Sequence, residues 1–230
     1  MHVRKPSDSV VGDGSNVRGE DLGAAELGVA QASGEPRELA EEDVLRADAY
    51  ALLGWLLKSP PKRDDLRRVG ALQGDKSEFG QAMSALAAAA RATTPEAVEE
   101  EYFNLFIGVG RGEVVPYASY YLAGFLLEKP LANVRIDMTQ LGIARADGVC
   151  EPEDHIASLC EIMSGLITGA FGSPADLATQ QRFFDTHMAP WAEKFYEDLE
   201  AAKSAAFYMP VGKLGKLFVE IETQAFQMAA

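Results

Sequence analysis

The segment Glu151-Pro152-Glu153-Asp154-His155 is the part of this sequence best suited to chemistry. It places three carboxylates and an imidazole in the predicted opening turn of a helix whose apolar residues recur every three or four positions. One interpretation is structural, because proline and acidic residues are favoured where the helix dipole is positive. The other is a binding site, in which Asp154 pairs with a guanidinium and His155 supplies a titratable hydrogen-bond partner.

The same side chains suggest an alternative function, a metal-assisted hydrolase that uses Glu151, Asp154 and His155. Zinc sites need about four well-spaced ligands, and the other histidines, His2 and His187, lie far away in the sequence. The sequence has no nucleophile motif and no phosphate-binding loop motif. We therefore predict no catalytic residue, no metal and no cofactor, and keep the hydrolase as the second hypothesis.

A second candidate site lies upstream, in a segment rich in glycine and tyrosine. A predicted helix that carries Leu105 and Phe106 ends at three alternating glycines, and a loop then leads into the run Pro116–Tyr121. The glycines do not form a dinucleotide-binding motif, because that motif follows a strand. Clustered tyrosines either anchor a loop on the core or form one wall of a peptide groove at a small entropic cost. The sequence leaves both interpretations open.

An all-α fold must position these residues. Apolar residues recur at helical spacing, proline and glycine separate the segments, and no window alternates with the two-residue period of a strand. We predict a non-repetitive bundle of about nine or ten helices. The segments with the clearest helical pattern are about 41–59, 77–91, 95–107, 119–127, 130–141, 151–171, 175–187, 190–203 and 211–228.

Residues 1–40 differ from the rest of the chain in composition. They contain six glycines and no aromatic residue, so little apolar area offsets the entropy lost on ordering. We expect a disordered tail over residues 1–40 and a single helical domain over residues 41–230.

The charge balance excludes several classes of protein. The 230 residues carry 21 Lys and Arg against 35 Asp and Glu, a formal net charge of −14, which disfavours general nucleic-acid binding and favours basic partners. No apolar run reaches the roughly 18–20 residues that span a membrane, and the N-terminus has no secretory signal. With only Cys150 and Cys160, a cytoplasmic protein is expected, as a monomer or homodimer.

Both candidate segments resemble the TorD/DmsD family of redox-enzyme maturation chaperones. The resemblance covers the chain from about residue 41 to the C-terminus, and its motifs occur in the family's order and spacing. These motifs are Glu101–Phe106 followed by Gly108, Pro116–Tyr121, Pro130-Leu131 with Arg135, and Glu151–His155.

The resemblance implies a chaperone that is not an enzyme. It implies a molybdoenzyme apoprotein as partner, such as a formate dehydrogenase or a dimethyl sulfoxide or trimethylamine N-oxide reductase, bound through its twin-arginine signal peptide or its body before cofactor insertion and export. We expect Asp154 to contact an arginine and His155 to position the loop or the peptide, which requires the two segments to meet in space. The residues that the resemblance assigns to the peptide groove are Leu105, Phe106, Pro116, Tyr117, Ser119, Tyr121, Glu151, Asp154 and His155.

Overall fold

The computed structural model describes residues 3–4, 39–145 and 151–229. This part contains ten α-helices, one π-helical turn and two short strands, which confirms the predicted all-α bundle of about nine or ten helices. In chain order the elements are β1 (Val3–Arg4), α1 (Glu41–Lys58), α2 (Arg63–Gly70), α3 (Glu78–Ala92), α4 (Pro95–Tyr102), the π-helical turn η1 (Phe103–Ile107), α5 (Ala118–Ala123), α6 (Lys129–Gln140), β2 (Ala144–Arg145), α7 (Ile156–Thr168), α8 (Leu177–His187), α9 (Ala192–Glu200) and α10 (Tyr208–Ala229).

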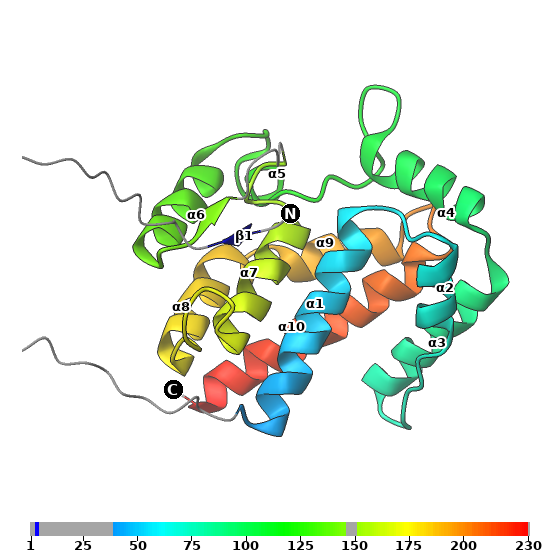
Figure 1. Cartoon of the computed structure of the whole chain (residues 1–230). Coiled ribbons are helices and arrows are strands. Elements are labelled where there is room, and N and C mark those ends of the chain that lie inside the picture. Colours follow the sequence, from blue (N-terminus) through cyan, green and yellow to red (C-terminus); the bar gives the residue numbers. More distant parts are fainter. Residues whose placement is uncertain (1–2, 5–38, 146–150, 230) are drawn as a thin grey trace, which may run out of the picture.

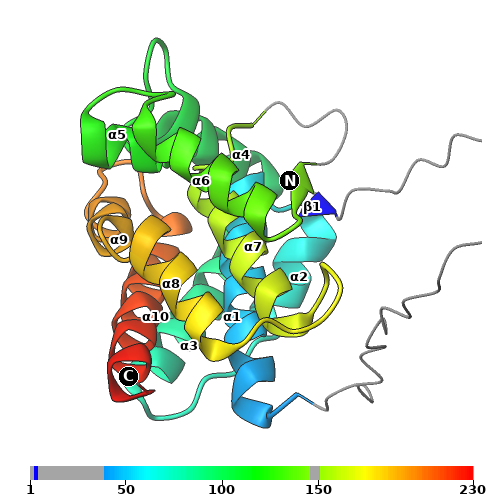
Figure 2. The same cartoon turned by 90° about the vertical axis from the view of Figure 1, so that its left-hand side faces the viewer.

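The middle of the molecule is built from α1, α7, α9 and α10. Helix α1 packs along α7, and α10 packs on both α9 and α3. Helices α2, α3 and α4 lie together at one end, while α6 and α8 lie toward the other (Figure 1). In the view turned by 90°, α5 and α6 again lie above α7, α8 and α9 (Figure 2). The two candidate segments of the sequence enter the fold where α5 meets α7.

Helix α7 is buried along almost its whole length, with ten of its thirteen residues in the core. Its closest neighbour is α1, where a Cβ on Gly54 would lie 3.1 Å from the carbonyl oxygen of Ala157. Cys160 lies in this interface, fully buried, and burial raises the pKa of its thiol to about 12. The cysteine is therefore an inert core residue, as its position on the apolar stripe predicts.

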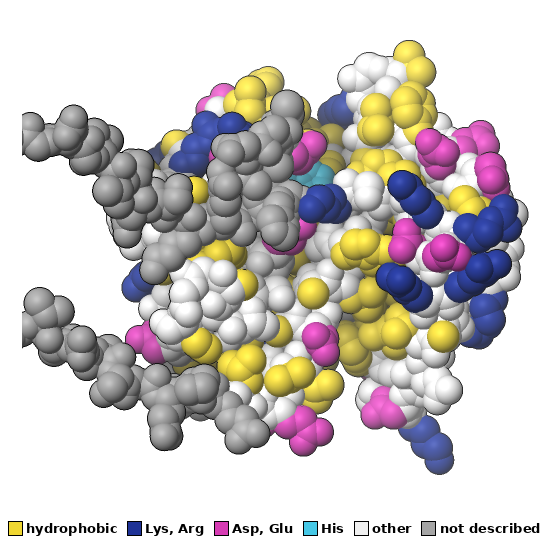
Figure 3. Space-filling model, viewed as in Figure 1, with side chains coloured by type: hydrophobic (Ala, Val, Ile, Leu, Met, Phe, Trp, Pro, Cys, Tyr) yellow, Lys and Arg dark blue, Asp and Glu magenta, His cyan; other side chains and the backbone are white. Residues whose placement is uncertain are grey.

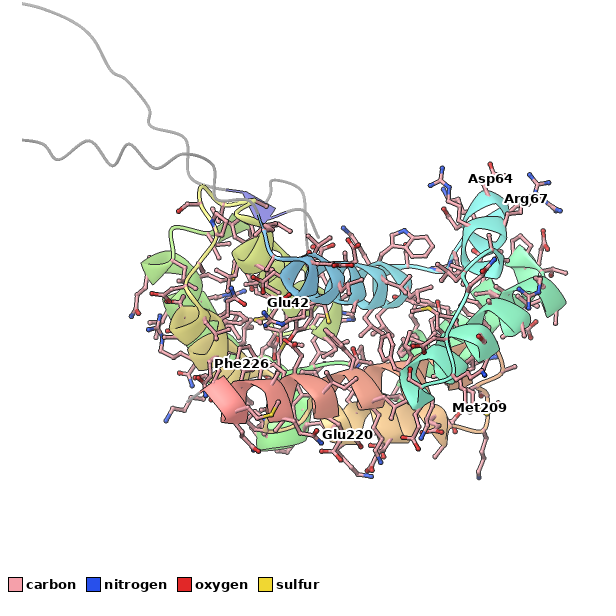
Figure 4. The ribbon with its side chains drawn as sticks, turned by 90° about the horizontal axis from the view of Figure 1, so that it is seen from below. Glu42, Asp64, Arg67, Met209, Glu220 and Phe226 are labelled. Carbon is pink, nitrogen blue, oxygen red and sulfur yellow. The ribbon has the colours of Figure 1, made fainter. Side chains whose placement is uncertain are left out.

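Helices α1, α8 and α10 are joined by a buried ionic network that the sequence analysis did not predict. The fully buried carboxylate of Glu222 accepts hydrogen bonds from Arg46 Nε at 2.7 Å and from the Tyr50 hydroxyl at 3.0 Å. Arg46 also packs over the ring of Phe226, on the side of α10 that faces α1, whereas Glu220 lies on the outer side (Figure 4).

The start of α4 was predicted correctly from its local capping group. Thr94 Oγ1 accepts a hydrogen bond from Ala97 N at 3.3 Å, with Pro95 in the first turn of α4. Helix α1 begins at Glu41, where the sequence predicts that order begins.

Several elements differ from the prediction. Helix α2 was not predicted, because only Leu66 and Val69 of its eight residues are buried. It projects Asp64 and Arg67 away from the body of the molecule (Figure 4). The helix predicted over 119–127 ends at Ala123, because Gly124 adopts a left-handed conformation with φ of 82°. Helix α10 begins at Tyr208, three residues before the predicted start at 211.

The strands are a further departure from the predicted pattern. Val3 and Arg4 pair with Arg145 and Ala144 in a two-residue antiparallel ladder. Most of the predicted tail, residues 1–40, lies outside the described residues, as does Cys150, so the tail and the 41–230 boundary stay predictions.

None of the helices in the described residues combines the length and the apolar character that a membrane-spanning helix needs.

Candidate functional site

The two candidate segments meet at the start of α7. Ile156 N donates to Pro116 O at 2.9 Å, and Ala118 N donates to Asp154 O at 3.0 Å. These bonds form an antiparallel bridge that sets Tyr117 opposite His155. The expectation that the segments come together in space is therefore confirmed.

The acidic segment was predicted to form the opening turn of the helix. This prediction is wrong, because the segment precedes the helix. Helix α7 begins at Ile156, and His155 is its N-cap, whose ring Nδ1 accepts a hydrogen bond from Ala157 N at 3.1 Å. Burial lowers the pKa of His155 to about 3, so the imidazole is neutral near pH 7. Capping thus comes from the imidazole, while the proline and the acids lie outside the helix.

Asp154 holds the tyrosine-bearing segment in place through a hydrogen bond to its backbone. Its side chain is buried, with an exposed fraction of 1%, and Oδ2 accepts a hydrogen bond from Ser119 N at 2.9 Å. Its Oδ1 has no hydrogen-bond partner among the described residues. Because the carboxylate is covered, an arginine can reach it only if the segment around Ser119 opens.

Glu153 is also buried, and it connects the acidic segment to α6 and β2. Its carboxylate lies 2.8 Å from Arg135 Nε and 3.6 Å from an Arg145 guanidinium nitrogen. Arg135, one of the residues that carry the family resemblance, therefore has a structural partner in this fold.

The exposed carboxylate of the segment is Glu151, which accepts a hydrogen bond from the Tyr117 hydroxyl. The Tyr117 ring packs edge-on against His155, with 5.0 Å between centroids. Burial, and after it the Glu151 hydrogen bond and charge, raise the pKa of Tyr117. Burial and the same charge raise the pKa of Tyr102 to about 12, which places both tyrosines within the field of Glu151.

An aromatic cluster continues from Tyr102 along the same side. The ring of Phe106 lies 4.9 Å from that of Tyr102 and 5.4 Å from that of Tyr208, and Phe106 and Tyr102 are both half-buried. We name Tyr102, Phe106, Tyr117 and Glu151 the aromatic–acidic groove. Figure 3 shows a hollow on this face between two raised parts that carry hydrophobic side chains, the loop after η1 and the region of α5 and α6.

The remaining residues assigned to the groove lie elsewhere. Leu105 is a fully buried core residue, and Pro116 and Ser119 are buried as well. Tyr121 points toward α9, where its hydroxyl donates to Asp198 at 3.0 Å and its ring lies 5.3 Å from that of Trp191. The assigned residues therefore divide into a small surface group and a larger supporting group.

Sequence reasoning missed two carboxylates that brace the site. Buried Glu101 accepts hydrogen bonds from the backbone nitrogens of Ala206, Phe207 and Tyr208 at 2.7–3.0 Å. Glu113 accepts from Lys203 N and Ser204 N at 2.6 and 3.0 Å. No local pattern in the sequence signals these contacts, because each partner lies about 90 to 107 residues away.

The profile of the nitrate reductase delta subunit family matches residues 72–197, more than half of the chain. The chain belongs to this family. The matched region contains both candidate segments and the junction between them.

Proteins named TorD are similar to this chain over half of its length or more. The chaperone protein TorD of Aliivibrio fischeri is 24% identical over 208 residues, which cover 81% of this chain and 97% of that protein. TorD of Vibrio atlanticus is 26% identical over 54% of this chain and 61% of its own length. These relatives confirm the resemblance to the TorD/DmsD family.

A solved crystal structure with lower sequence identity shares the fold. A candidate redox enzyme maturation protein from Archaeoglobus fulgidus superposes with a TM-score of 0.51 at 20% identity, covering 82% of this chain and 99% of that chain. Family membership and the TorD relatives identify the protein as a chaperone of the TorD type rather than an enzyme.

The hydrolase alternative is not supported. Glu151, Asp154 and His155 each engage a different partner, namely Tyr117, Ser119 and the backbone of Ala157. Among the residues that the structure describes, no group of three or more His, Cys, Asp and Glu side chains is placed to hold a metal ion.

Proposed function

We propose that this protein is a cytoplasmic chaperone that binds the twin-arginine signal peptide of a molybdoenzyme apoprotein and holds it until cofactor insertion, before export. The resemblance favours a formate dehydrogenase or a dimethyl sulfoxide or trimethylamine N-oxide reductase as client. The observation that carries the proposal is the exposed carboxylate of Glu151, held by Tyr117 beside half-buried aromatic rings. The chain works as a monomer or homodimer, without nucleic acid and without stable insertion into a membrane.

The groove matches the chemistry of such a peptide. A carboxylate binds a guanidinium through charge-assisted hydrogen bonds, which are among the stronger polar contacts in proteins. Aromatic faces bind the guanidinium and its aliphatic stem, so the rings of Phe106 and Tyr117 contact the arginines and their neighbours. The buried members of the assigned set hold these groups in place, namely Leu105, Pro116, Ser119, Asp154 and His155, and Tyr121 borders the groove toward α9.

Calorimetric titration with a synthetic twin-arginine peptide tests the proposal. We expect Glu151→Gln to weaken binding about tenfold, the size of one hydrogen bond to a charged group. Asp154→Asn should change the affinity much less, because asparagine keeps an oxygen acceptor for Ser119 N. A peptide with both arginines changed to glutamine should bind the wild-type protein as weakly as the variant does.

Glu42→Gln is the matched control. It removes the same charge from the first turn of α1, at the opposite end from Leu57, whose carbonyl contacts Tyr102. Equal affinities of Glu151→Gln and Glu42→Gln for the arginine peptide would contradict the proposal, as would wild-type binding that does not distinguish arginine from glutamine.

A further inference from the structure

Four large apolar side chains are exposed at the end of α5 and on the turn that follows it. The exposed fractions are 45% for Leu122, 72% for Phe125, 52% for Leu126 and 68% for Leu127. We name these residues the apolar turn. None of them is among the buried residues that form the hydrophobic core of the described part of the chain. A set of exposed apolar residues this close together typically marks an interaction surface.

The backbone of the apolar turn is strained. Leu127 has φ of 61°, and among the described residues it is the one non-glycine residue with a positive φ. The left-handed conformation costs a residue with a side chain about 1–2 kcal/mol. The residue in this conformation is a leucine whose side chain is 68% exposed. Strain of this kind is found where function requires it.

Buried hydrogen bonds join the apolar turn to the acidic segment. Glu128 N donates to Ser119 Oγ at 3.2 Å, and Ser119 N donates to Asp154 Oδ2 at 2.9 Å. The position of the turn is therefore fixed relative to the aromatic–acidic groove. Helix α5, six residues long, separates Tyr117 from the turn, and at 1.5 Å per residue this distance is about 9 Å.

The exposed area favours a peptide over a second copy of the chain. A stable protein dimer buries roughly 800 Å² on each partner. Four partly exposed side chains supply well under that area, because a whole large apolar side chain buries only about 150–250 Å². An apolar helical peptide, by contrast, binds through only three or four anchoring side chains on one of its faces, so it needs a smaller surface.

We infer that the apolar turn docks the apolar, helix-forming segment that follows the arginines in a signal peptide. This inference rests on the proposed function, in which Glu151 binds the arginine end. The short distance along α5 lets one extended or helical peptide contact both places. The turn then selects for length and hydrophobicity of the leader, whereas the groove selects for charge.

The test measures binding of three labelled peptides by fluorescence anisotropy. The first has the arginine pair and the apolar segment, the second has the arginine pair alone, and the third has the apolar segment with both arginines changed to glutamine. The double variant Phe125→Ser/Leu126→Ser should bind the first and third peptides about tenfold more weakly than the wild type does and bind the second equally well. Ile221→Ser, which removes an exposed apolar residue from α10, should bind all three as the wild type does.

Each negative result contradicts a different part of the proposal. If the double variant is folded by circular dichroism and binds the first and third peptides like the wild type, the apolar turn is not the docking surface. The same conclusion follows if the variant loses only self-association in sedimentation experiments. If the third peptide binds wild-type protein as tightly as the first and the double variant weakens both, the turn stands and the arginine-binding function fails.

Discussion

At the scale of single residues, the site separates groups that contact solvent from groups that hold them in place. Glu151 and Tyr117 are accessible, whereas Asp154 and His155 are almost completely buried. A motif read from sequence gives no burial for its members, so all of them were assigned to the peptide. Asp154 instead holds Ser119 in place, because its carboxylate forms its hydrogen bond with the chain itself.

The buried histidine gives the fold a dependence on pH. Burial lowers the pKa of His155 from 6.5 to about 3 in the folded state, so between these values the unfolded chain binds a proton that the native protein does not. The free energy of unfolding that depends on a neutral His155 is therefore fully present at neutral pH, and it is lost as the pH falls from about 6.5 toward 3. We expect His155→Asn, which keeps a good helix cap, to lose less stability than the wild type over this range.

Urea unfolding at a series of pH values measures this effect. The free-energy difference between wild type and His155→Asn should shrink or reverse as the solution is acidified. His187, whose pKa burial also lowers, is present in both proteins and cancels in the comparison. Two curves that stay parallel from pH 7 to about 4 would show that His155 does not titrate on unfolding.

At the scale of elements, the start of α10 depends on a side chain from α4. Three backbone nitrogens at residues 206–208 donate to the Glu101 carboxylate, which satisfies donors that a helix start otherwise leaves free. A glutamine has one acceptor oxygen and cannot serve all three. We expect Glu101→Gln to lower the free energy of unfolding by about 1–3 kcal/mol.

Thermal or urea unfolding checks this prediction, with Glu100→Gln as its control. Glu100 is the preceding residue and is exposed, so its variant changes the charge of α4 without removing the cap. A loss of stability shared by both variants would point to helix charge and not to the contacts with residues 206–208.

Elements with local signals were predictable, and those fixed by distant contacts were not. Thr94 and Pro95 predict the start of α4, because helix capping depends on residues within a few positions of the helix start. Helix α2 has little apolar periodicity, because it contacts the body through only two buried residues. The proline in the acidic segment suggested a helix start, but the bridge to Tyr117 holds His155 extended, and the helix begins only at Ile156.

The sequence predicted which segments of the candidate site lie close together, but it predicted less well which of their residues are exposed. Two motifs 35 residues apart gave the pairing of Tyr117 with the acidic segment, which the hydrogen bond from Ser119 to Asp154 bears out. Tyr102 joined the groove only through packing with Phe106. The exposure of Leu127 depends on a backbone conformation that leucine rarely adopts, and sequence rules predict against it.

At the scale of the whole molecule, the net charge of −14 sets how a basic peptide approaches. An acidic body attracts such a peptide at long range and accelerates association, and salt screens this attraction. We expect the affinity for the arginine peptide to fall steadily as sodium chloride is raised to about 0.5 M, where the Debye length is only a few ångströms. The association rate, measured by stopped flow, should carry much of the change.

A peptide that has the apolar segment but no arginine is the comparison for the salt series. Its binding should change little or strengthen, because burial of apolar surface does not depend on charge. Equal salt sensitivity of both peptides would mean that the acidic surface does not guide the arginines.

The carboxylates of Glu101 and Glu113 also link the client side of the molecule to a distant connection. Glu101 lies one turn before Leu105, and both carboxylates bind backbone nitrogens of the 203–208 segment between α9 and α10. A ligand that stiffens η1 and the loop after it therefore restrains amides that it never touches. Deuterium uptake at residues 203–208 therefore reports remotely on occupancy of the aromatic–acidic groove, in protein that carries no label.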